Sequence, residues 1–269
     1  MSTKDEVLEF WDRAACGEDL LLRAQDVDGF DAQANARYRL EPYILSFADF
    51  AAWRDCDVLE IGLGLGADHE RFALNGARMS GIDLTGRAVE ITRKRFELKG
   101  LHSSLTVGDA EALPYEDASF DLVYSWGVIH HTPDTVKAAS EILRVLRPGG
   151  EFRVMIYHTY SLVGVMLWLR YGLMRGRPLT SLAALYAAHL ESPGTKAYTR
   201  AEAEQLFSAA ERVQTKVELT HGDLLESGAG QRHRGAALSL ARLVWPRWLL
   251  RRIGSSLGLF LLVSGRKAR

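Results

Sequence analysis

Residues 57–66 read Asp57-Val58-Leu59-Glu60-Ile61-Gly62-Leu63-Gly64-Leu65-Gly66. The first five residues predict a short buried strand, and the alternating glycines after them predict a tight loop. Residues 67–75 have the apolar spacing of a helix. A glycine-rich loop between a strand and a helix lets backbone N–H groups approach a ligand closely, and the helix N-terminus favours a negative group. This stretch therefore predicts a binding site for a ligand with an anionic end.

From residue 56 onward, short β-branched runs alternate with longer amphipathic stretches. That alternation is typical of strand–helix units around a parallel sheet, so we predict an α/β protein. The segment Leu146-Arg147-Pro148-Gly149-Gly150 predicts a turn that ends a helix and launches a strand. Further strands are expected over residues 77–83, 104–108, 120–125, 151–157, 213–219 and 258–263, and helices over 85–99, 135–145 and 199–210.

Two further segments are predicted to be helical. Residues 1–55 read as a helical lead-in. Residues 158–197 are rich in Leu, Ala, Met, Trp and Tyr with helical spacing and no strand signal, so they read as an insertion within a single domain spanning residues 1–269. The helix after the insertion opens on a capping-box pattern that pairs Thr199 with Glu202.

Composition excludes several functional classes. The 269 residues carry a formal net charge of -1, so no overall positive field draws the chain to nucleic acid. Cys16 and Cys56 make neither a disulfide framework nor a metal cluster, and no metal site is predicted. The N-terminus is polar and acidic, unlike a secretory signal, and the apolar runs fall short of the roughly 20 residues of a spanning helix. A cytoplasmic location is the simplest expectation.

Acidic residues follow the second and third strands. Asp83 lies at the distance from the glycine loop at which a carboxylate can accept hydrogen bonds from both hydroxyls of a ribose. Asp109 and Ala110 close the third strand with a carboxylate and a turn that suit the edge of an adenine. Taken singly, the glycines fit a tight turn, Asp83 a helix cap and Asp109 a turn residue. Their joint order favours binding of an adenosine.

These motifs resemble those of class I S-adenosylmethionine-dependent methyltransferases, in particular the small-molecule branch that includes the ubiquinone and menaquinone methyltransferases. The resemblance covers roughly residues 56–157 and implies a Rossmann-like, doubly wound, seven-stranded sheet, mostly parallel with an antiparallel last strand. It also implies S-adenosyl-L-methionine as the cofactor. The motifs are Val58-Leu59-Glu60-Ile61-Gly62-x-Gly64-x-Gly66, Gly81-Ile82-Asp83, Gly108-Asp109-Ala110, Phe120-Asp121-Leu122-Val123 and Leu146-Arg147-Pro148-Gly149-Gly150.

The same resemblance implies which residues contact the cofactor. Glu60 fixes the glycine loop, and Tyr38 belongs to an N-terminal region that in related enzymes folds over the cofactor. A ring such as that of Tyr38 can face a sulfonium, although an aromatic residue there is as often plain core. The remaining contacts implied are Gly62, Gly64 and Gly66 under the methionine, Asp83 and Leu84 at the ribose, Asp109 and Ala110 at the adenine, and Ser125 and Trp126 near the methionine amino group and sulfonium.

Methyl transfer requires alignment of a nucleophile, exclusion of water and, for some acceptors, removal of a proton. His130 and His131 follow the fourth strand and are candidate general bases, because imidazole titrates near neutral pH. One of the two is expected to be a packed histidine that supports the loop. Tyr157 and His158 end the fifth strand beside the same crevice; Tyr157 is a further candidate catalytic residue and His158 a candidate for substrate binding.

The insertion is where substrate specificity is expected, since lids over a crevice commonly exclude water. Its apolar character predicts a hydrophobic small-molecule substrate, with O-methylation as a guess and secondary metabolism as the setting. His189 and Glu191 lie where the insertion rejoins the core and could bind that substrate, unless they belong to a solvated loop.

The C-terminal residues 232–269 contain nine Lys and Arg side chains and no acid. A solvated basic helix face is the preferred explanation, and weak contact with a membrane surface is the alternative.

Two other functions stay open at this point. One is a nicotinamide-dependent oxidoreductase, which the alternating glycines disfavour, and the other is a non-catalytic membrane-surface module on a degenerate methyltransferase fold.

Overall fold

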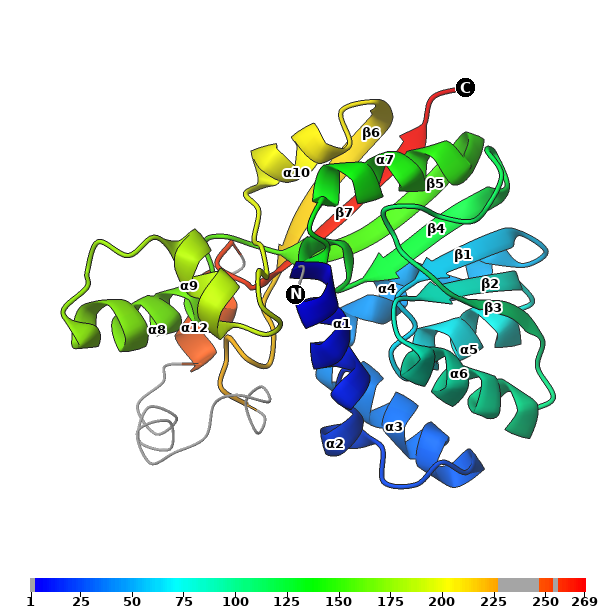
Figure 1. Ribbon diagram of the computed structural model, residues 1–269, viewed down its shortest axis with the longest axis horizontal. Helices are drawn as coiled ribbons and strands as arrows, with labels where there is room; N and C mark the ends of the chain where they lie inside the picture. The colour runs from blue at the N-terminus through cyan, green and yellow to red at the C-terminus, as the bar shows by residue number, and fades with distance from the viewer. Residues whose placement is uncertain (1–2, 227–246, 254–255) are drawn as a thin grey trace.

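The computed structural model describes residues 3–226, 247–253 and 256–269. Its centre is a seven-stranded sheet in the order β3-β2-β1-β4-β5-β7-β6, in which only β7 runs antiparallel to its neighbours (Figure 1). This confirms the predicted Rossmann-like doubly wound sheet. The strands are β1 Asp57–Ile61, β2 Arg78–Asp83, β3 Ser103–Val107, β4 Phe120–Trp126, β5 Leu146–Tyr157, β6 Ala210–Glu218 and β7 Phe260–Lys267.

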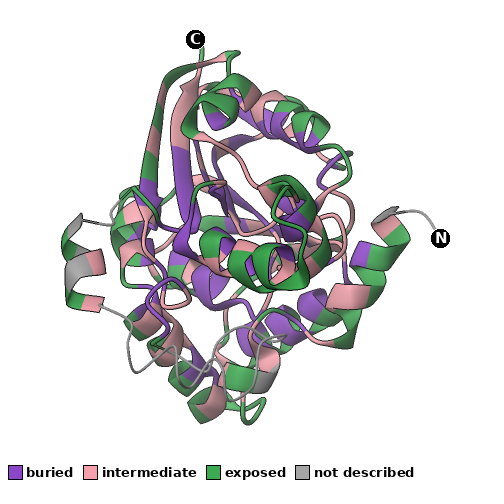
Figure 2. Ribbon diagram, turned by 90° about the vertical axis from the view of Figure 1, so that its left-hand side faces the viewer, coloured by how far each residue is buried: buried purple, intermediate pink, exposed green. Residues whose placement is uncertain are grey.

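Helices cover both faces of the sheet because successive strand residues point to opposite sides. Leu59 and Val123 pack in one apolar cluster with Ala138 of α7, whereas Val58 packs on the other face with Phe72 of α5. Figure 2 shows the buried residues gathered along the strands and the inner sides of the helices. The flanking helices are α5 Ala67–Leu74, α6 Gly86–Leu98, α7 Thr135–Val145 and α10 Arg200–Leu206.

The predicted turn at residues 146–150 is wrong. Strand β5 begins at Leu146, which pairs with Phe120 of β4, directly after α7 ends at Val145. The register of this pairing shifts between Phe120 and Leu122, and Gly149 has a φ of 80°. The glycines therefore absorb a β-bulge within a longer strand instead of closing a turn.

The N-terminal residues form a series of helices, of which α1 and α3 contact α5 or α6. The helix after the insertion is capped by the predicted box: the Thr199 hydroxyl accepts a hydrogen bond from the Glu202 N–H, and the Glu202 carboxylate accepts one from the Thr199 N–H. The N-terminal elements are α1 Thr3–Arg13, α2 Glu18–Leu21, α3 Val27–Leu40, α4 Tyr43–Ala48 and the 3-10 turn η1 Phe50–Trp53.

The insertion projects from the end of the sheet in Figure 1. Its inner side packs through Leu167, Leu185 and Tyr186 against Tyr157 of β5 and Phe260 of β7. The elements of the insertion are α8 Leu162–Leu167, the π-helical turn η3 Trp168–Gly172, the 3-10 turn η4 Leu173–Arg175 and α9 Leu182–His189.

The basic C-terminal segment lies partly outside the described residues, which include only 247–253 and 256–269 of it. Residues Arg247–Ile253 form α12. Within the described parts of the chain, no helix is both long and apolar enough to cross a membrane.

One buried cation joins the N-terminal helices to the sheet layer. Arg95 of α6 is fully buried and donates hydrogen bonds to the Gln33 side chain at 2.7 Å and to the carbonyl oxygens of Leu65 and Phe30 at 3.0 and 3.1 Å. It also pairs with the carboxylate of Glu70 on α5. A single side chain therefore connects α3, the glycine loop, α5 and α6.

We expect Arg95→Met to destabilise the protein by about 3–5 kcal/mol, because it removes one partner of a buried ion pair and leaves Glu70 in place. Urea unfolding followed by circular dichroism measures this change. The matched control is Arg93→Met on the exposed side of the same helix, which should change stability by no more than about 0.5 kcal/mol. Equal effects of the two substitutions would contradict the role given to Arg95.

Candidate functional site

The glycine loop leaves the carboxyl end of β1 in a conformation that suits glycine. Gly62, Gly64 and Gly66 have φ values of 83°, 52° and 74°. A Cβ on Gly62 would lie 2.0 Å from a methyl carbon of Val128, whereas a Cβ on Gly64 would meet no atom within 4 Å. The loop therefore packs closely against the segment after β4 at Gly62 and leaves open space beside Gly64.

Asp83, at the end of β2, holds this loop. Its Oδ2 accepts a hydrogen bond from the Leu63 N–H at 2.8 Å and a longer one from the Gly64 N–H at 3.5 Å. Its Oδ1 accepts from the backbone N–H and the hydroxyl of Thr85 at 2.9 and 2.8 Å. A carboxylate offers about four acceptor sites, so three short bonds leave about one for a ligand. Asp83 can therefore accept hydrogen bonds from both ribose hydroxyls, as predicted, only if it loses one of its bonds to the glycine loop.

Glu60 lies under the loop and is buried. Its Oε2 is 2.9 Å from Nδ1 of His69 on α5, and Nε2 of that ring is 2.7 Å from the Ser103 hydroxyl of β3. Burial raises the pKa of Glu60 well above its ordinary value and lowers the pKa of His69 to about 3, so the imidazole is neutral. This chain of contacts ties the strand before the loop to the helix after it.

The end of β3 is covered by the N-terminal helix. The ammonium of Lys4 in α1 donates to Asp109 Oδ2 at 2.5 Å and to Glu111 Oε2 at 2.7 Å. Asp109 also accepts from the Glu111 N–H at 2.9 Å, Ala110 is buried in the core, and Leu84 is half-buried. A ligand edge that reaches Asp109 would therefore meet Lys4 as well.

Strand β4 ends on a buried hydroxyl and a half-buried ring. Among the described residues, the Ser125 hydroxyl has no hydrogen-bond partner although its side chain is fully buried. The Trp126 ring stacks on Tyr43 at 6.1 Å between centroids, and the guanidinium of Arg37 lies 5.9 Å from the Trp126 centroid. An unpaired buried hydroxyl is costly and is the kind of group that a bound polar ligand satisfies.

A buried carboxylate that the sequence analysis did not single out organises this region. Asp68, in the first turn of α5, accepts hydrogen bonds from Arg37 at 2.6 and 3.1 Å, from the Tyr38 hydroxyl at 3.1 Å and from the Tyr124 hydroxyl at 3.0 Å. The available signal was its position two residues after Gly66, because acidic residues are favoured in the first turn of a helix. The sequence around Arg37 contains no local pattern that identifies it as the partner of Asp68.

Tyr38 is buried, and its ring packs on Phe50 while the guanidinium of Arg71 lies 4.9 Å from the ring centroid. Its hydroxyl donates to the Ala67 carbonyl as well as to Asp68. These contacts place Tyr38 at the start of α5, and a direct contact of its ring with a ligand stays a prediction.

The two histidines after β4 lie in the 3-10 turn η2 Ile129–His131 and are both buried. Nδ1 of His131 is 2.8 Å from the Ser192 hydroxyl and 3.1 Å from that of Thr195, while its Nε2 is 3.4 Å from Glu191 Oε2. Neither ring nitrogen of His130 has a partner among the described residues. Burial, with His131 beside it, lowers the pKa of His130 well below its ordinary value.

Tyr157 of β5 completes this cluster. Its hydroxyl donates to Glu191 Oε2 at 2.6 Å, and its ring centroid is 4.1 Å from that of His130. Burial and the nearby Glu191 carboxylate raise the pKa of Tyr157 well above its ordinary value, so the phenol stays protonated. From α1, the Trp11 ring meets His131 edge-on at 5.4 Å. The structure therefore brings together four of the predicted residues, and an aromatic ring from the N-terminal helix lies against them.

Two further predicted substrate contacts, His158 and His189, have other partners. His158 is buried, and its Nδ1 is 3.2 Å from the carbonyl oxygen of Gly258, two residues before β7. His189 stacks on Tyr171 within the insertion at 3.9 Å between centroids. The first contact joins the end of β5 to the segment before β7, and the second lies within the insertion.

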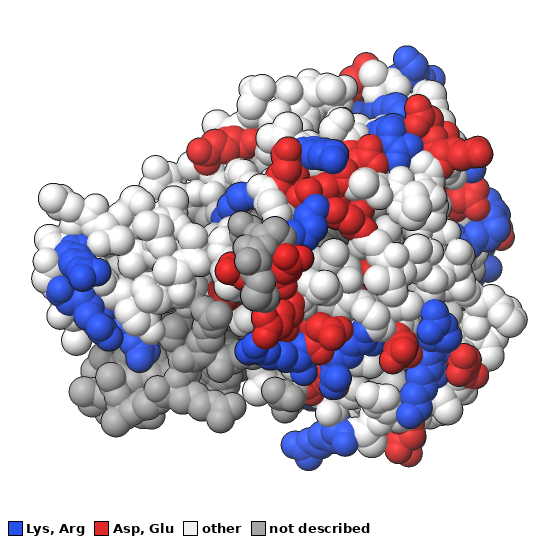
Figure 3. Space-filling model, viewed as in Figure 1, with Lys and Arg blue, Asp and Glu red and all other residues white. Residues whose placement is uncertain are grey.

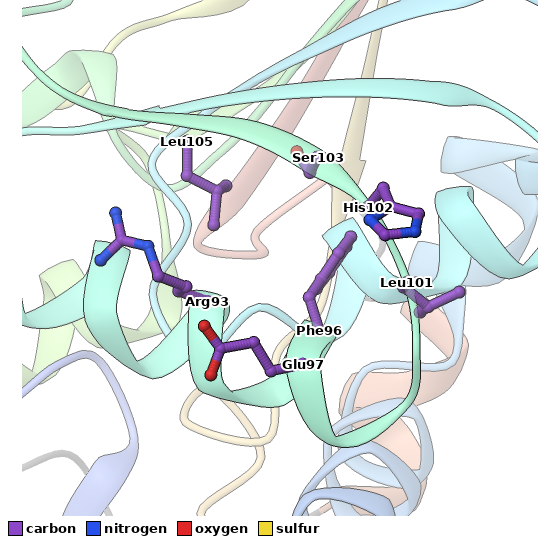
Figure 4. A pocket seen from close by; sticks show the side chains of 7 residues that line it. All are labelled: Arg93, Phe96, Glu97, Leu101, His102, Ser103 and Leu105. Atoms are coloured by element: carbon purple, nitrogen blue, oxygen red, sulfur yellow. The ribbon is translucent and has the colours of Figure 1, made fainter.

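Figure 4 shows a separate pocket of about 300 Å³ between α6 and the start of β3, which includes Arg93, Glu97 and His102 in its lining. It lies at the end of β3 opposite to Asp109. No group of His, Cys, Asp and Glu side chains suited to hold a metal ion was found within the described residues.

A second acid near the site, Glu41, has a raised pKa. Glu41, just after α3, is 8% exposed, and its Oε2 lies 3.4 Å from Nη1 of Arg37. Burial raises the pKa of Glu41 to about 7, with Arg37 opposing that rise and with Asp68 and Glu191 adding to it. The folded protein therefore holds the Glu41 proton more tightly than the unfolded chain does, where the pKa is about 4.5.

This difference predicts that stability falls as the pH rises from about 4.5 to 7, by about 3 kcal/mol in total. Glu41→Gln should remove that part of the pH dependence and raise the unfolding midpoint more at pH 8 than at pH 5. Urea unfolding at a series of pH values measures it. The control is Glu116→Gln in an exposed turn, and an unchanged pH slope in Glu41→Gln would refute the assignment.

Comparison with known proteins gives one family and several relatives. Residues 59–154 match the family model described as a methyltransferase domain. The chain is 40% identical over 97 residues to phthiotriol/phenolphthiotriol dimycocerosates methyltransferase of Mycobacterium tuberculosis, covering 35% of each chain. It is 33% identical over 98 residues to sterol 4-C-methyltransferase strm-1 of Caenorhabditis elegans, covering 36% of this chain and 29% of that protein. The chain thus spans about a third of the length of these curated relatives.

Among solved structures, phosphoethanolamine N-methyltransferase 2 of Haemonchus contortus superposes with a TM-score of 0.62 at 18% identity, covering all of this chain and 61% of that one. That likeness concerns the fold, while the family match concerns β1 to β5 and the loops that carry the site. Residues 59–154 of this chain accordingly match a methyltransferase domain, and the chain shares its fold with that solved methyltransferase.

Proposed function

We propose that the protein is an S-adenosylmethionine-dependent methyltransferase that transfers a methyl group to an oxygen of a hydrophobic small molecule. The observation that carries the proposal is the convergence of four strand ends, at Gly64, Asp83, Asp109 and Ser125, beside the cluster of His131, Tyr157 and Glu191. In open α/β sheets, ligands bind at the carboxyl ends of the strands. The order of the motifs also favours the small-molecule branch that includes the quinone methyltransferases.

The residues present fit S-adenosylmethionine. Gly64 faces open space, Ser125 has an unpaired buried hydroxyl, and Asp83 keeps about one free acceptor site. Asp83 would hold the ribose, Asp109 and Ala110 the adenine, and the glycine loop with Ser125 and Trp126 the methionine part. When bound there, the cofactor supplies an electrophilic methyl group. The role of the chain is to orient the acceptor, exclude water and take up the proton that the acceptor loses.

Glu191 is the group best placed to take that proton. Its carboxylate accepts a hydrogen bond from Tyr157 at 2.6 Å, and its Oε2 lies 3.4 Å from Nε2 of His131, which has no hydrogen-bond partner among the described residues. The Ser192 hydroxyl can donate to Nδ1 of His131, which leaves the ring hydrogen on Nε2, toward Glu191. Tyr157 stays protonated and acts as a donor, so we assign it and His131 as positioning residues. His130 packs under this pair and supports the loop.

The apolar insertion and the relatives support a hydrophobic acceptor. Tyr157 lies in one cluster with Leu185 and Tyr186 of α9 and Phe260 of β7, so the insertion borders the reaction site. Two of the relatives are named for methylation of a mycocerosate lipid and of a sterol. A carboxylate base suits a hydroxyl acceptor, which must lose its proton as the methyl group arrives. The insertion then serves as the substrate lid.

The cofactor is tested by calorimetric titration with S-adenosylhomocysteine, with NADH as the parallel ligand. We expect binding of the former alone, and we expect Asp83→Asn to weaken it by about 1.5–3 kcal/mol, or roughly 10- to 150-fold. Asp55→Asn, in an exposed turn at the opposite end of β1, is the matched control. Binding of NADH alone would favour an oxidoreductase, and unchanged affinity in Asp83→Asn would exclude the ribose contact.

The base is tested once a screen of apolar alcohols and phenols has identified an acceptor. We expect Glu191→Gln to lower kcat by roughly 100-fold or more with little change in the Kd of S-adenosylhomocysteine, because it removes the proton acceptor alone. Tyr157→Phe should lower kcat less, and both should alter the acidic limb of the pH–rate profile. Glu116→Gln is the control. Full activity of Glu191→Gln would move the proton-accepting role to another group.

A further inference from the structure

The outer surface of the insertion is apolar. Residues 162–189, called the arm below, run from α8 to α9 and project from the sheet (Figure 1). Leu179 and Met174 are 98% and 81% exposed, the highest values among the large hydrophobic side chains that the structure describes. Water does not favour such side chains, and contiguous exposed apolar groups mark interaction surfaces. The arm also exposes Val165, Leu169 and Leu173.

This apolar face lies along one helical run. Val165, Leu169 and Leu173 follow one another at intervals of four along α8, η3 and η4, which places them along one side of the helical run. The opposite side carries Leu167, which is buried and packs in the cluster with Tyr157. The helical run is therefore apolar on both sides, although only one side faces the core. A surface helix of a soluble protein ordinarily has a polar outer face.

The charges of the arm all have one sign. It contains Arg170, Arg175 and Arg177 and no Asp or Glu. All three arginines are exposed, and the guanidinium of Arg170 lies 5.2 Å from the centroid of the Tyr171 ring. Within the described residues, none of the three forms an ion pair with a carboxylate. Figure 3 shows Lys and Arg side chains, and no Asp or Glu, at the projecting end of the molecule on the face in view. The overall net charge of -1 makes this local excess of positive charge distinctive.

From these observations we infer that the arm docks on an anionic lipid bilayer. Exposed leucine and methionine side chains beside arginines are the composition of an interfacial membrane segment, in which the apolar groups enter the acyl boundary and the guanidinium groups contact the headgroups. Anionic lipids complement three arginines that have no acid among them. A second copy of the chain fits less well, since a two-fold contact between arms would bring six arginines together without a counter-charge.

Docking in this way would serve the site beside it. The inner side of the arm borders Tyr157, so an acceptor that leaves the bilayer could reach the cluster under the same helices. This use of the arm rests on the proposed function, whereas the membrane contact itself does not. The two are separable, because vesicle binding is measured without a cofactor and the titration with S-adenosylhomocysteine is measured without vesicles.

The experiment is flotation of the full chain with vesicles of phosphatidylcholine alone or of phosphatidylcholine and phosphatidylglycerol in equal parts. We expect binding to the anionic vesicles that weakens with added salt. The variant Arg175→Gln/Arg177→Gln should reduce the partition coefficient by roughly 30-fold. Each arginine near an anionic surface contributes about 1 kcal/mol, and about 1.4 kcal/mol corresponds to a tenfold change in the partition coefficient. The variant Met174→Asp/Leu179→Asp should abolish binding.

The matched control is Leu74→Asp/Val136→Asp, which places the same charges at side chains 60% and 65% exposed on α5 and α7. It should float as the unmodified chain does, and all variants should keep their circular dichroism and their affinity for S-adenosylhomocysteine. The inference is overturned if the unmodified chain stays unbound to anionic vesicles, or if the Met174→Asp/Leu179→Asp variant binds as well. It is also overturned if light scattering shows a dimer that only the arm variants dissociate, since the arm would then cover a second copy.

Discussion

The site depends on the buried carboxylate of Asp68. It lies directly after the glycine loop and accepts hydrogen bonds from two residues of α3, Arg37 and Tyr38, and from Tyr124 of β4. A buried carboxylate is costly unless it is paired and fully hydrogen-bonded, so these segments must assemble around it together. This requirement sets the position of the N-terminal helices relative to the strand ends, and with it the place where Trp126 and Glu41 lie.

The cluster that we assign to proton transfer combines residues at the strand ends with residues of the insertion. His131 and Tyr157 follow β4 and end β5, while Glu191, Ser192 and Thr195 come from the end of the insertion. The sheet supplies the rigid partners, and the insertion supplies the carboxylate. A change in the insertion can therefore alter the acceptor and the base together without disturbing the glycine loop, which explains how one fold can host many methyl acceptors.

The arm gives the insertion a second role on its outer face. Its inner residues pack against the core around Tyr157, while its exposed leucines and methionine lie in the same segment as three exposed arginines. Both properties come from one apolar stretch of sequence, because a helix without a polar face buries one side against the protein and leaves the other to a partner. The same composition that predicts a hydrophobic substrate also accounts for a surface suited to lipid.

The sequence by itself determined the fold class, the seven strands and the places of the glycine loop and Asp83 at strand ends, because period, glycine spacing and strand-end carboxylates are local signals. It misplaced the start of β5, where a β-bulge at Gly149 resembles a turn. Only the tertiary structure decided that Asp68 joins α3 to β4, that Lys4 covers Asp109 and that Glu191 meets Tyr157. Those pairs are far apart in sequence, and their contacts depend on packing that no local pattern encodes.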